Sequence, residues 1–232
     1  NVSTVTQAGL NNSSEWSQVG NLNVITVMQE SLNDGNNEAN IVQVGLSDIV
    51  YVKQWGDDHF ADQSQTDGTN NTAEIYQDQS NNSSTQSQKG TRNFAISAQN
   101  GYKPLNFQGT GGDNVSEQTQ KGFSNQSYIA QGTASELVDE VPGIDSFGSR
   151  NTASVSQEGF ENFAAVGQIN GDDNTAEVSQ VGILNSAVVG QGLGNFNFAK
   201  STQVGEGHSN TLYQRGSRNS FTVMQANAVT QP

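Results

Sequence analysis

The chain contains no cysteine, and lysine and arginine together number only 9 among 232 residues, against 23 aspartates and glutamates. The absence of cysteine excludes a disulfide framework and thiol chemistry. The formal net charge of -14 argues against nucleic acid as a partner, because binding nucleic acid needs a basic face. No apolar run approaches the roughly 18 residues of a membrane helix, so we expect no membrane insertion.

Hydrophobic residues are also scarce, at 32%, and charged residues make up only 14%. A chain of this composition could be disordered. Its dominant polar residues, however, are asparagine, glutamine, serine and threonine, and amide-rich chains can instead form β-structure. A regular spacing decides between the two, because disordered linkers keep none. The start at Asn1, without methionine or an apolar leader, further suggests a removed secretion signal, although a truncated chain would look the same.

One short phrase recurs along the chain. In Asn174–Gln180, asparagine comes first, alanine follows two residues later, and glutamine closes the phrase. The closing glutamines recur at steps of about 11 or 12 residues, and two steps give a period of roughly 22–23 residues, which is typical of a solenoid. With a degenerate member at Gln108 they define nineteen half-repeats. The other glutamines form a predicted structural ladder: Gln7, Gln18, Gln29, Gln43, Gln54, Gln65, Gln77, Gln88, Gln99, Gln120, Gln131, Gln157, Gln168, Gln180, Gln191, Gln203, Gln214 and Gln225.

Asparagine opens most of these phrases, and glycine usually lies two residues after the glutamine. Glycine supplies the positive φ that a tight turn requires, so we expect each unit to be a strand of about six or seven residues followed by a turn. The predicted ladder asparagines are Asn12, Asn23, Asn37, Asn71, Asn82, Asn93, Asn114, Asn125, Asn151, Asn162, Asn174, Asn185, Asn197 and Asn219. The predicted turn glycines are Gly9, Gly20, Gly45, Gly56, Gly90, Gly122, Gly159, Gly182, Gly205 and Gly216.

The phrase alternates with the period of a β-strand. In Asn174–Gln180 the recurring Asn, Ala, Val and Gln point one way, and the variable residues point the other way. The recurring set is therefore the inside, where amides stacked at about 4.8 Å can pair along the axis as donors and acceptors. Burying such an amide unpaired costs roughly 1–3 kcal/mol. We predict an all-β solenoid with two short strands per turn, about nine and a half turns and two facing parallel sheets.

We expect a single domain over residues 1–232, with three interruptions of the repeat. A lengthened turn lies near 30–37, and a degenerate half-repeat lies near 100–113. An acidic excursion at 132–150 is interpreted as an exposed loop, or alternatively as a contact site for a neighbouring subunit. The stretch after Gln225 is too short for another strand, so we expect the last half-turn to be incomplete.

The repeat resembles the curlin repeat, the unit of the subunits of curli, which are bacterial extracellular amyloid fibres. The Gln-to-Gln part of that repeat reads Gln-x-Gly-x-x-Asn-x-Ala-x-x-x-Gln. Residues Gln157–Gln168 and Gln180–Gln191 match it, and Gln7–Gln18 matches it with Ser14 in place of alanine. The resemblance covers nearly the whole chain. Here asparagine usually replaces the leading serine of the family, the repeats are more numerous, and the sequence opens on a repeat, which leaves the secretion route open.

The resemblance implies a structural subunit of a curli-like functional amyloid: a secreted cross-β fibril at the cell surface that assembles end to end and supports biofilm and cell adhesion. Its implied partners are copies of itself, a nucleator subunit and an outer-membrane secretion channel. One alternative is the minor subunit that nucleates or anchors the same fibre. Another is a monomeric solenoid that binds carbohydrate or ice, although the outward positions lack a regular threonine array.

We do not expect an enzyme, because a narrow filled interior leaves no pocket and no catalytic triad is present. The sequence predicts no catalytic, cofactor-binding or metal-binding residues. His59 and His208 occupy the asparagine position of the phrase. We interpret both histidines as ladder substitutes.

Overall fold

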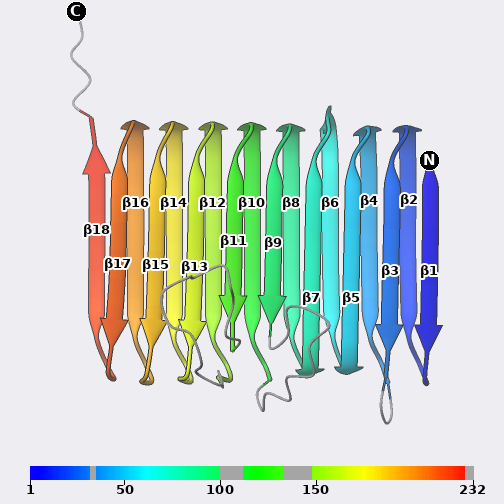
Figure 1. The fold of residues 1–232 in the computed structure, drawn as a ribbon, viewed down its shortest axis with the longest axis horizontal. Coiled ribbons are helices and arrows are strands. Elements are labelled where there is room, and N and C mark those ends of the chain that lie inside the picture. Colours follow the sequence, from blue (N-terminus) through cyan, green and yellow to red (C-terminus); the bar gives the residue numbers. More distant parts are fainter. Residues whose placement is uncertain (32–34, 100–111, 133–147, 228–232) are drawn as a thin grey trace, which may run out of the picture.

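The computed structural model describes residues 1–31, 35–99, 112–132 and 148–227. The regular structure in these segments consists of β-strands, numbered β1 to β18 along the chain (Figure 1). Their bounds are β1 Val2–Ala8, β2 Ser13–Asn21, β3 Val24–Glu30, β4 Glu38–Leu46, β5 Ile49–Asp57, β6 Phe60–Thr69, β7 Thr72–Ser80, β8 Ser83–Thr91, β9 Phe94–Gln99, β10 Val115–Phe123, β11 Gln126–Gln131, β12 Thr152–Phe160, β13 Phe163–Ile169, β14 Thr175–Ile183, β15 Ser186–Gly192, β16 Phe198–Glu206, β17 Ser209–Arg215 and β18 Ser220–Ala226.

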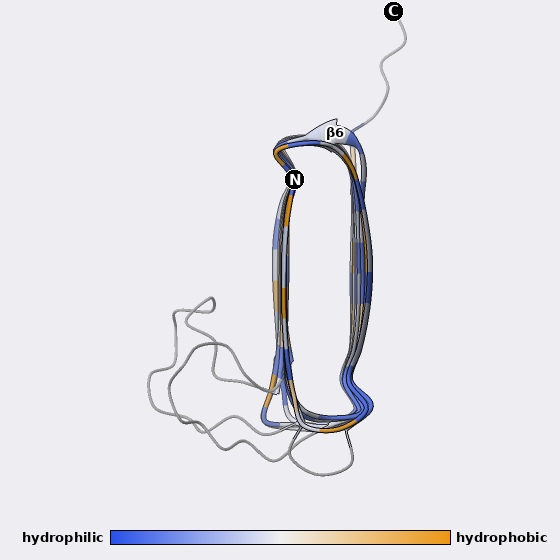
Figure 2. Cartoon of the chain, turned by 90° about the vertical axis from the view of Figure 1, so that its right-hand side faces the viewer, coloured by the Kyte–Doolittle hydropathy of each residue, from blue (hydrophilic) through white to orange (hydrophobic). Residues whose placement is uncertain are grey.

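The chain alternates between two sheets. Sheet A contains the odd-numbered strands in chain order, and sheet B contains the even-numbered strands in chain order. Neighbouring strands within each sheet pair in parallel, for example β12 with β14 and β13 with β15. Viewed along the stack, the strands superimpose into one narrow, flattened outline (Figure 2). The predicted all-β solenoid with two facing parallel sheets is confirmed. We call each odd strand with the following even strand a rung, from rung 1 (β1 and β2) to rung 9 (β17 and β18).

The closing glutamine sets the register. It lies opposite the closing glutamine of the next strand in every pairing, as at Gln157 and Gln180. A slip by one residue would turn the whole inward set toward solvent, so the repeated phrase specifies the pairing strongly. An irregularity occurs in β6, whose pairings with β4 and with β8 both shift register. The register shifts after Val44, and Gly45 pairs with Gly68. The extra residue makes β6 protrude at the rim of the outline (Figure 2).

The inward side chains form a thin core between the sheets. Burial alternates along the strands, as in β5 and β7, so that one face of each strand is inside and the other is wet. The buried apolar residues are mainly alanine, valine and isoleucine, and they form two clusters. One cluster spans rungs 2 to 4 and the other spans rungs 6 to 9. Between them the inward positions are mostly polar.

The number of turns differs from the prediction. Each sheet has nine strands, which corresponds to eight full turns from β1 to β17 followed by β18, not nine and a half turns. Gln108 and the rest of 100–111 lie outside the described residues. The pairing of β10 with β8 and of β11 with β9 leaves no place in either sheet for a strand closing at Gln108. The sequence analysis predicted a strand ending at this glutamine because it relied on spacing alone.

That correction changes the end of the stack as well. With one half-repeat fewer, β18 becomes the second strand of rung 9, and it pairs with β16 over its full length. The expectation of an incomplete last half-turn is therefore wrong.

The other two interruptions fall where they were expected, between strands. β3 ends at Glu30 and β4 begins at Glu38, with residues 32–34 outside the described part. The stretch between β11 and β12 contains residues 133–147, which are also outside it. Both sheets continue past this stretch, because β10 pairs with β12 and β11 pairs with β13. In the described part of the chain, no helix is long and apolar enough to cross a membrane.

Candidate functional site

The glutamine ladders are continuous chains of hydrogen bonds. In every step of both sheets, the side-chain Nε2 donates to Oε1 of the glutamine in the next rung, over 2.7–3.1 Å. For example, Gln157 donates to Gln180 and Gln180 donates to Gln203, both over 2.8 Å. All eighteen predicted ladder glutamines lie in these two columns.

The second Nε2 proton of each glutamine usually bonds the facing sheet. Gln180 donates to the Phe163 carbonyl over 2.9 Å, and Gln168 donates to the Thr152 carbonyl over 3.0 Å. Because these carbonyls fix which side of the amide carries nitrogen, each ladder has a direction. The donors point toward rung 9 and the acceptors toward rung 1. Both amide protons and the oxygen take part in hydrogen bonds. Burying these side chains therefore leaves few donors or acceptors without a partner.

The asparagine columns at the corners work differently from the expected amide stack. In Asn174, the backbone N–H donates to Oδ1 of Asn151 over 3.0 Å. The asparagine Nδ2 commonly donates to a carbonyl at the adjoining turn, as from Asn162 to Gly182 over 3.0 Å. Some direct amide contacts are also present, such as Asn185 Nδ2 to Asn162 Oδ1 at 3.1 Å. The asparagines therefore fasten the corners: the backbone N–H groups donate toward rung 1, while Nδ2 often donates to the turn of the following rung.

Most of the predicted ladder asparagines accept a backbone N–H in the same way as Asn151. Twelve of the fourteen accept the backbone N–H of the equivalent residue in the next rung. Asn219 is in the last rung and has no following residue to accept from within the described chain. Asn12, in rung 1, has a buried Oδ1 without a hydrogen-bond partner.

The predicted turn glycines are needed for two reasons. Nine of the ten have positive φ, such as Gly159 at 122°. Most of them also approach the next rung closely: a Cβ on Gly159 would lie 2.0 Å from the Gly182 carbonyl oxygen. Gly45 departs from the prediction and lacks positive φ, because the β6 irregularity shifts its partner to Gly68. The residue before the corner asparagine also takes a left-handed conformation, as at Leu184 with φ 55°. The sequence analysis missed these corner positions, which include leucine and arginine.

His59 takes the place of a corner asparagine in rung 3. Its Nε2 lies 3.2 Å from the Trp55 carbonyl, and its Nδ1 accepts the Asn82 backbone N–H over 3.4 Å. The neutral ring with a proton on Nε2 thus reproduces the donor and the acceptor of an asparagine. Burial lowers the pKa of His59 to about 4, against the opposing effects of the Trp55 hydrogen bond and the nearby Asp57 and Asp58. Ring protonation would place an N–H against the Asn82 N–H.

Asp48 is an acidic substitute in the other corner column, which precedes the strands of sheet A. Its Oδ1 accepts from the backbone N and from Nδ2 of Asn71, over 2.9 and 3.1 Å. Its Oδ2 is buried without a partner. At the equivalent place, Asn23 uses its Nδ2 to donate to the Gly45 carbonyl over 3.2 Å. Burial raises the pKa of Asp48, partly offset by the Asn71 hydrogen bonds. The neutral acid is the form that resembles asparagine here.

A third glutamine column, which the sequence analysis missed, runs through the polar middle of the core. Gln63 donates to Gln86 over 2.8 Å, and Gln86 donates to Gln118 over 2.6 Å. Beside this column, the hydroxyls of Ser97 and Ser116 lie 2.6 Å apart. These glutamines occupy the position that is valine or isoleucine in most of the other rungs. In the sequence, this third column could have been predicted from a glutamine two residues before the ladder glutamine.

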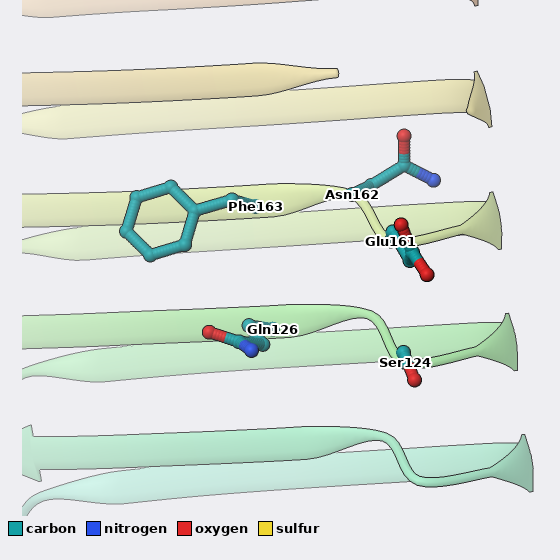
Figure 3. A pocket seen from close by; sticks show the side chains of 5 residues that line it. All are labelled: Ser124, Gln126, Glu161, Asn162 and Phe163. Atoms are coloured by element: carbon teal, nitrogen blue, oxygen red, sulfur yellow. The ribbon is translucent and has the colours of Figure 1, made fainter. Parts of the chain in front are cut away.

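A hollow between rungs 6 and 7 is lined by Ser124, Gln126, Glu161, Asn162 and Phe163 (Figure 3). It holds one carboxylate and no general base paired with a nucleophile. In the segments that the structure describes, no group of three or more His, Cys, Asp and Glu side chains could hold a metal ion.

A comparison with models of known protein families supports the repeat identified in the sequence. The family model for the curlin associated repeat matches residues 148–182 and residues 171–205. These matches span β12 to β16, where the phrase and the glutamine ladders are regular. No curated protein matches the chain.

Proposed function

Because this chain is a curlin-repeat protein, we propose that it is a structural subunit of an extracellular bacterial fibre of the curli type, which assembles by stacking copies end to end. The role is mechanical and not enzymatic. Supporting the biofilm matrix and adhesion to surfaces are the proposed uses of the fibre, and a nucleator subunit and an outer-membrane secretion channel are its proposed partners.

The observation that carries the proposal is the continuity of the stack. Both glutamine ladders run from rung 1 to rung 9 without a missing bond, and the strand register is repeated from rung to rung. Within the described residues, β1, β2, β17 and β18 each pair along one edge only. Such edges can template another chain. A further copy in the same orientation would extend both sheets and both ladders.

The test is fibre diffraction with negative-stain imaging on purified chain, left unseeded at low micromolar concentration. We expect filaments that grow without a partner and a meridional reflection near 4.7 Å, the spacing of stacked strands. A stable, β-rich monomer under these conditions would contradict self-assembly. The minor subunit would then be the better hypothesis, tested by whether that monomer accelerates assembly of another curlin.

A further inference from the structure

The first and last rungs carry inward residues of a size found nowhere else in the described stack. Trp16 in β2 aligns with Ile41, and Phe221 in β18 aligns with Ala199. They are the only tryptophan, tyrosine or phenylalanine at inward strand positions among the described residues. In the other rungs these two columns hold alanine, valine, isoleucine, serine and glutamine. Trp16 is 45% exposed and Phe221 is 50% exposed.

The two ends fit each other by size. Extending the observed register by one step places β18 of one copy beside β2 of the next, with the ladder glutamines aligned. Phe221 then lies opposite Ser14, a small residue, and Trp16 lies opposite Val223. The large side chain at each end therefore meets a smaller one from the other copy.

The ladders also distinguish the two ends. In rung 1, Oε1 of Gln7 and of Gln18 accepts no hydrogen bond from the described residues, while each Nε2 donates to the next rung. In rung 9, Nε2 of Gln214 and of Gln225 donates only to a backbone carbonyl, which leaves one proton for a further acceptor. The last rung thus offers donors and the first rung offers acceptors. Contact between like ends would run the strands antiparallel and align glutamine with the asparagine corner.

We infer that the last rung of one copy of this chain binds the first rung of a second copy in one polarity only, with Trp16 and Phe221 as the apolar contacts of the joint. The rung 9 glutamines donate to the rung 1 glutamines across it. The inference rests on the proposed end-to-end assembly and specifies which end meets which, and through which side chains. The partner is a second copy because its first rung carries the register and the free acceptors that match the donors of rung 9.

Two variants of the full chain test the joint, Trp16→Asp and Phe221→Asp. Both side chains are about half exposed, so each variant should keep the β-rich circular dichroism of the wild type. Each loses one end of the joint, because a carboxylate would be buried there without a partner. We expect filament elongation to fall on the order of 100-fold for each variant alone. Mixed together, the two variants should form a dimer containing one copy of each, measured by light scattering after size exclusion.

The matched control is Met224→Asp, which places the same charge in β18 on an outward side chain that is 75% exposed. It should elongate at the wild-type rate. In a Trp55→Phe background, emission from Trp16 should shift to the blue when the two variants are mixed. The inference is overturned if either variant dimerises with itself, if the mixture stays monomeric, or if both variants elongate normally. In the last case, with wild-type filaments present, the fibre proposal would stand without this joint.

Discussion

The substitution His59→Asn should remove a specific acid sensitivity from the folded chain. The folded structure holds the neutral ring, with a pKa of about 4 compared with the ordinary 6.5. Above pH 6.5 the imidazole is neutral in both states and contributes no pH dependence. Between pH 6.5 and 4 the unfolded chain binds a proton that the folded chain does not, so stability falls as pH falls.

The size of this effect follows from the pKa difference. Each unit of pKa corresponds to about 1.4 kcal/mol, so a shift from 6.5 to about 4 gives a loss of about 3 kcal/mol on reaching pH 4. Asparagine restores the corner contacts without a titrating group. The free energy of unfolding of His59→Asn relative to wild type should therefore increase by about 3 kcal/mol from pH 7.5 to pH 4.

The assay is urea unfolding of freshly dissolved monomer, before filaments form, at several pH values in that range. Taking the difference between variant and wild type cancels the carboxylates that both chains share. The matched control is His208→Asn, which makes the same substitution at a corner of rung 9 where the histidine contact with the Val204 carbonyl is exposed. A His59→Asn difference that stays constant with pH would refute the reasoning.

Three other substitutions test the ladders and turns. Asp48→Asn should stabilise the fold by an amount that grows as pH rises above 3.8, because the raised pKa keeps the folded carboxyl neutral where the unfolded one ionises; a gain independent of pH in the same urea series would count against this. Gln118→Ala removes the acceptor of the Gln86 amide and should cost roughly 1–3 kcal/mol in chemical unfolding, whereas no loss would mean that water replaces the bond. Gly182→Ala should lower stability by more than about 2 kcal/mol, since its Cβ would lie 1.9 Å from a carbonyl oxygen; Gly207→Ala, with no atom within 4 Å, is the control, and equal losses would exclude the close contact as the cause.

The sequence was sufficient for the architecture because the repeated phrase carries both the period and the inward face. Gln157, Gln180 and Gln203 recur at one interval, and that interval is the register of β12, β14 and β16. Spacing could not show whether a matching residue lies in the stack. Gln108 fits the interval, but the pairing of β8 with β10 leaves no strand for it.

The finer details depend on contacts that spacing does not encode. From the sequence alone, Gln63 resembles a polar residue that faces solvent. In the structure it is buried in the third glutamine column. Leu184 gives no sign of a left-handed corner, because leucine rarely takes that conformation without a surrounding structure that imposes it. Asn151 makes the amide contact that its chemistry suggested, with Nδ2 of Asn174, but its oxygen also accepts the Asn174 backbone N–H, which spacing does not show.

The opposite directions of the two kinds of ladder bear on how long a stack can become. Hydrogen-bond dipoles that point the same way add up, as in an α-helix, and leave partial charges at its ends. Here the glutamine amides donate toward rung 9, while the corner asparagines accept from donors that point toward rung 1. These bonds from the backbone N–H to the asparagine oxygen oppose the glutamine bonds along the axis. As rungs are added, these corner bonds therefore offset part of the axial dipole that the glutamine ladders build up.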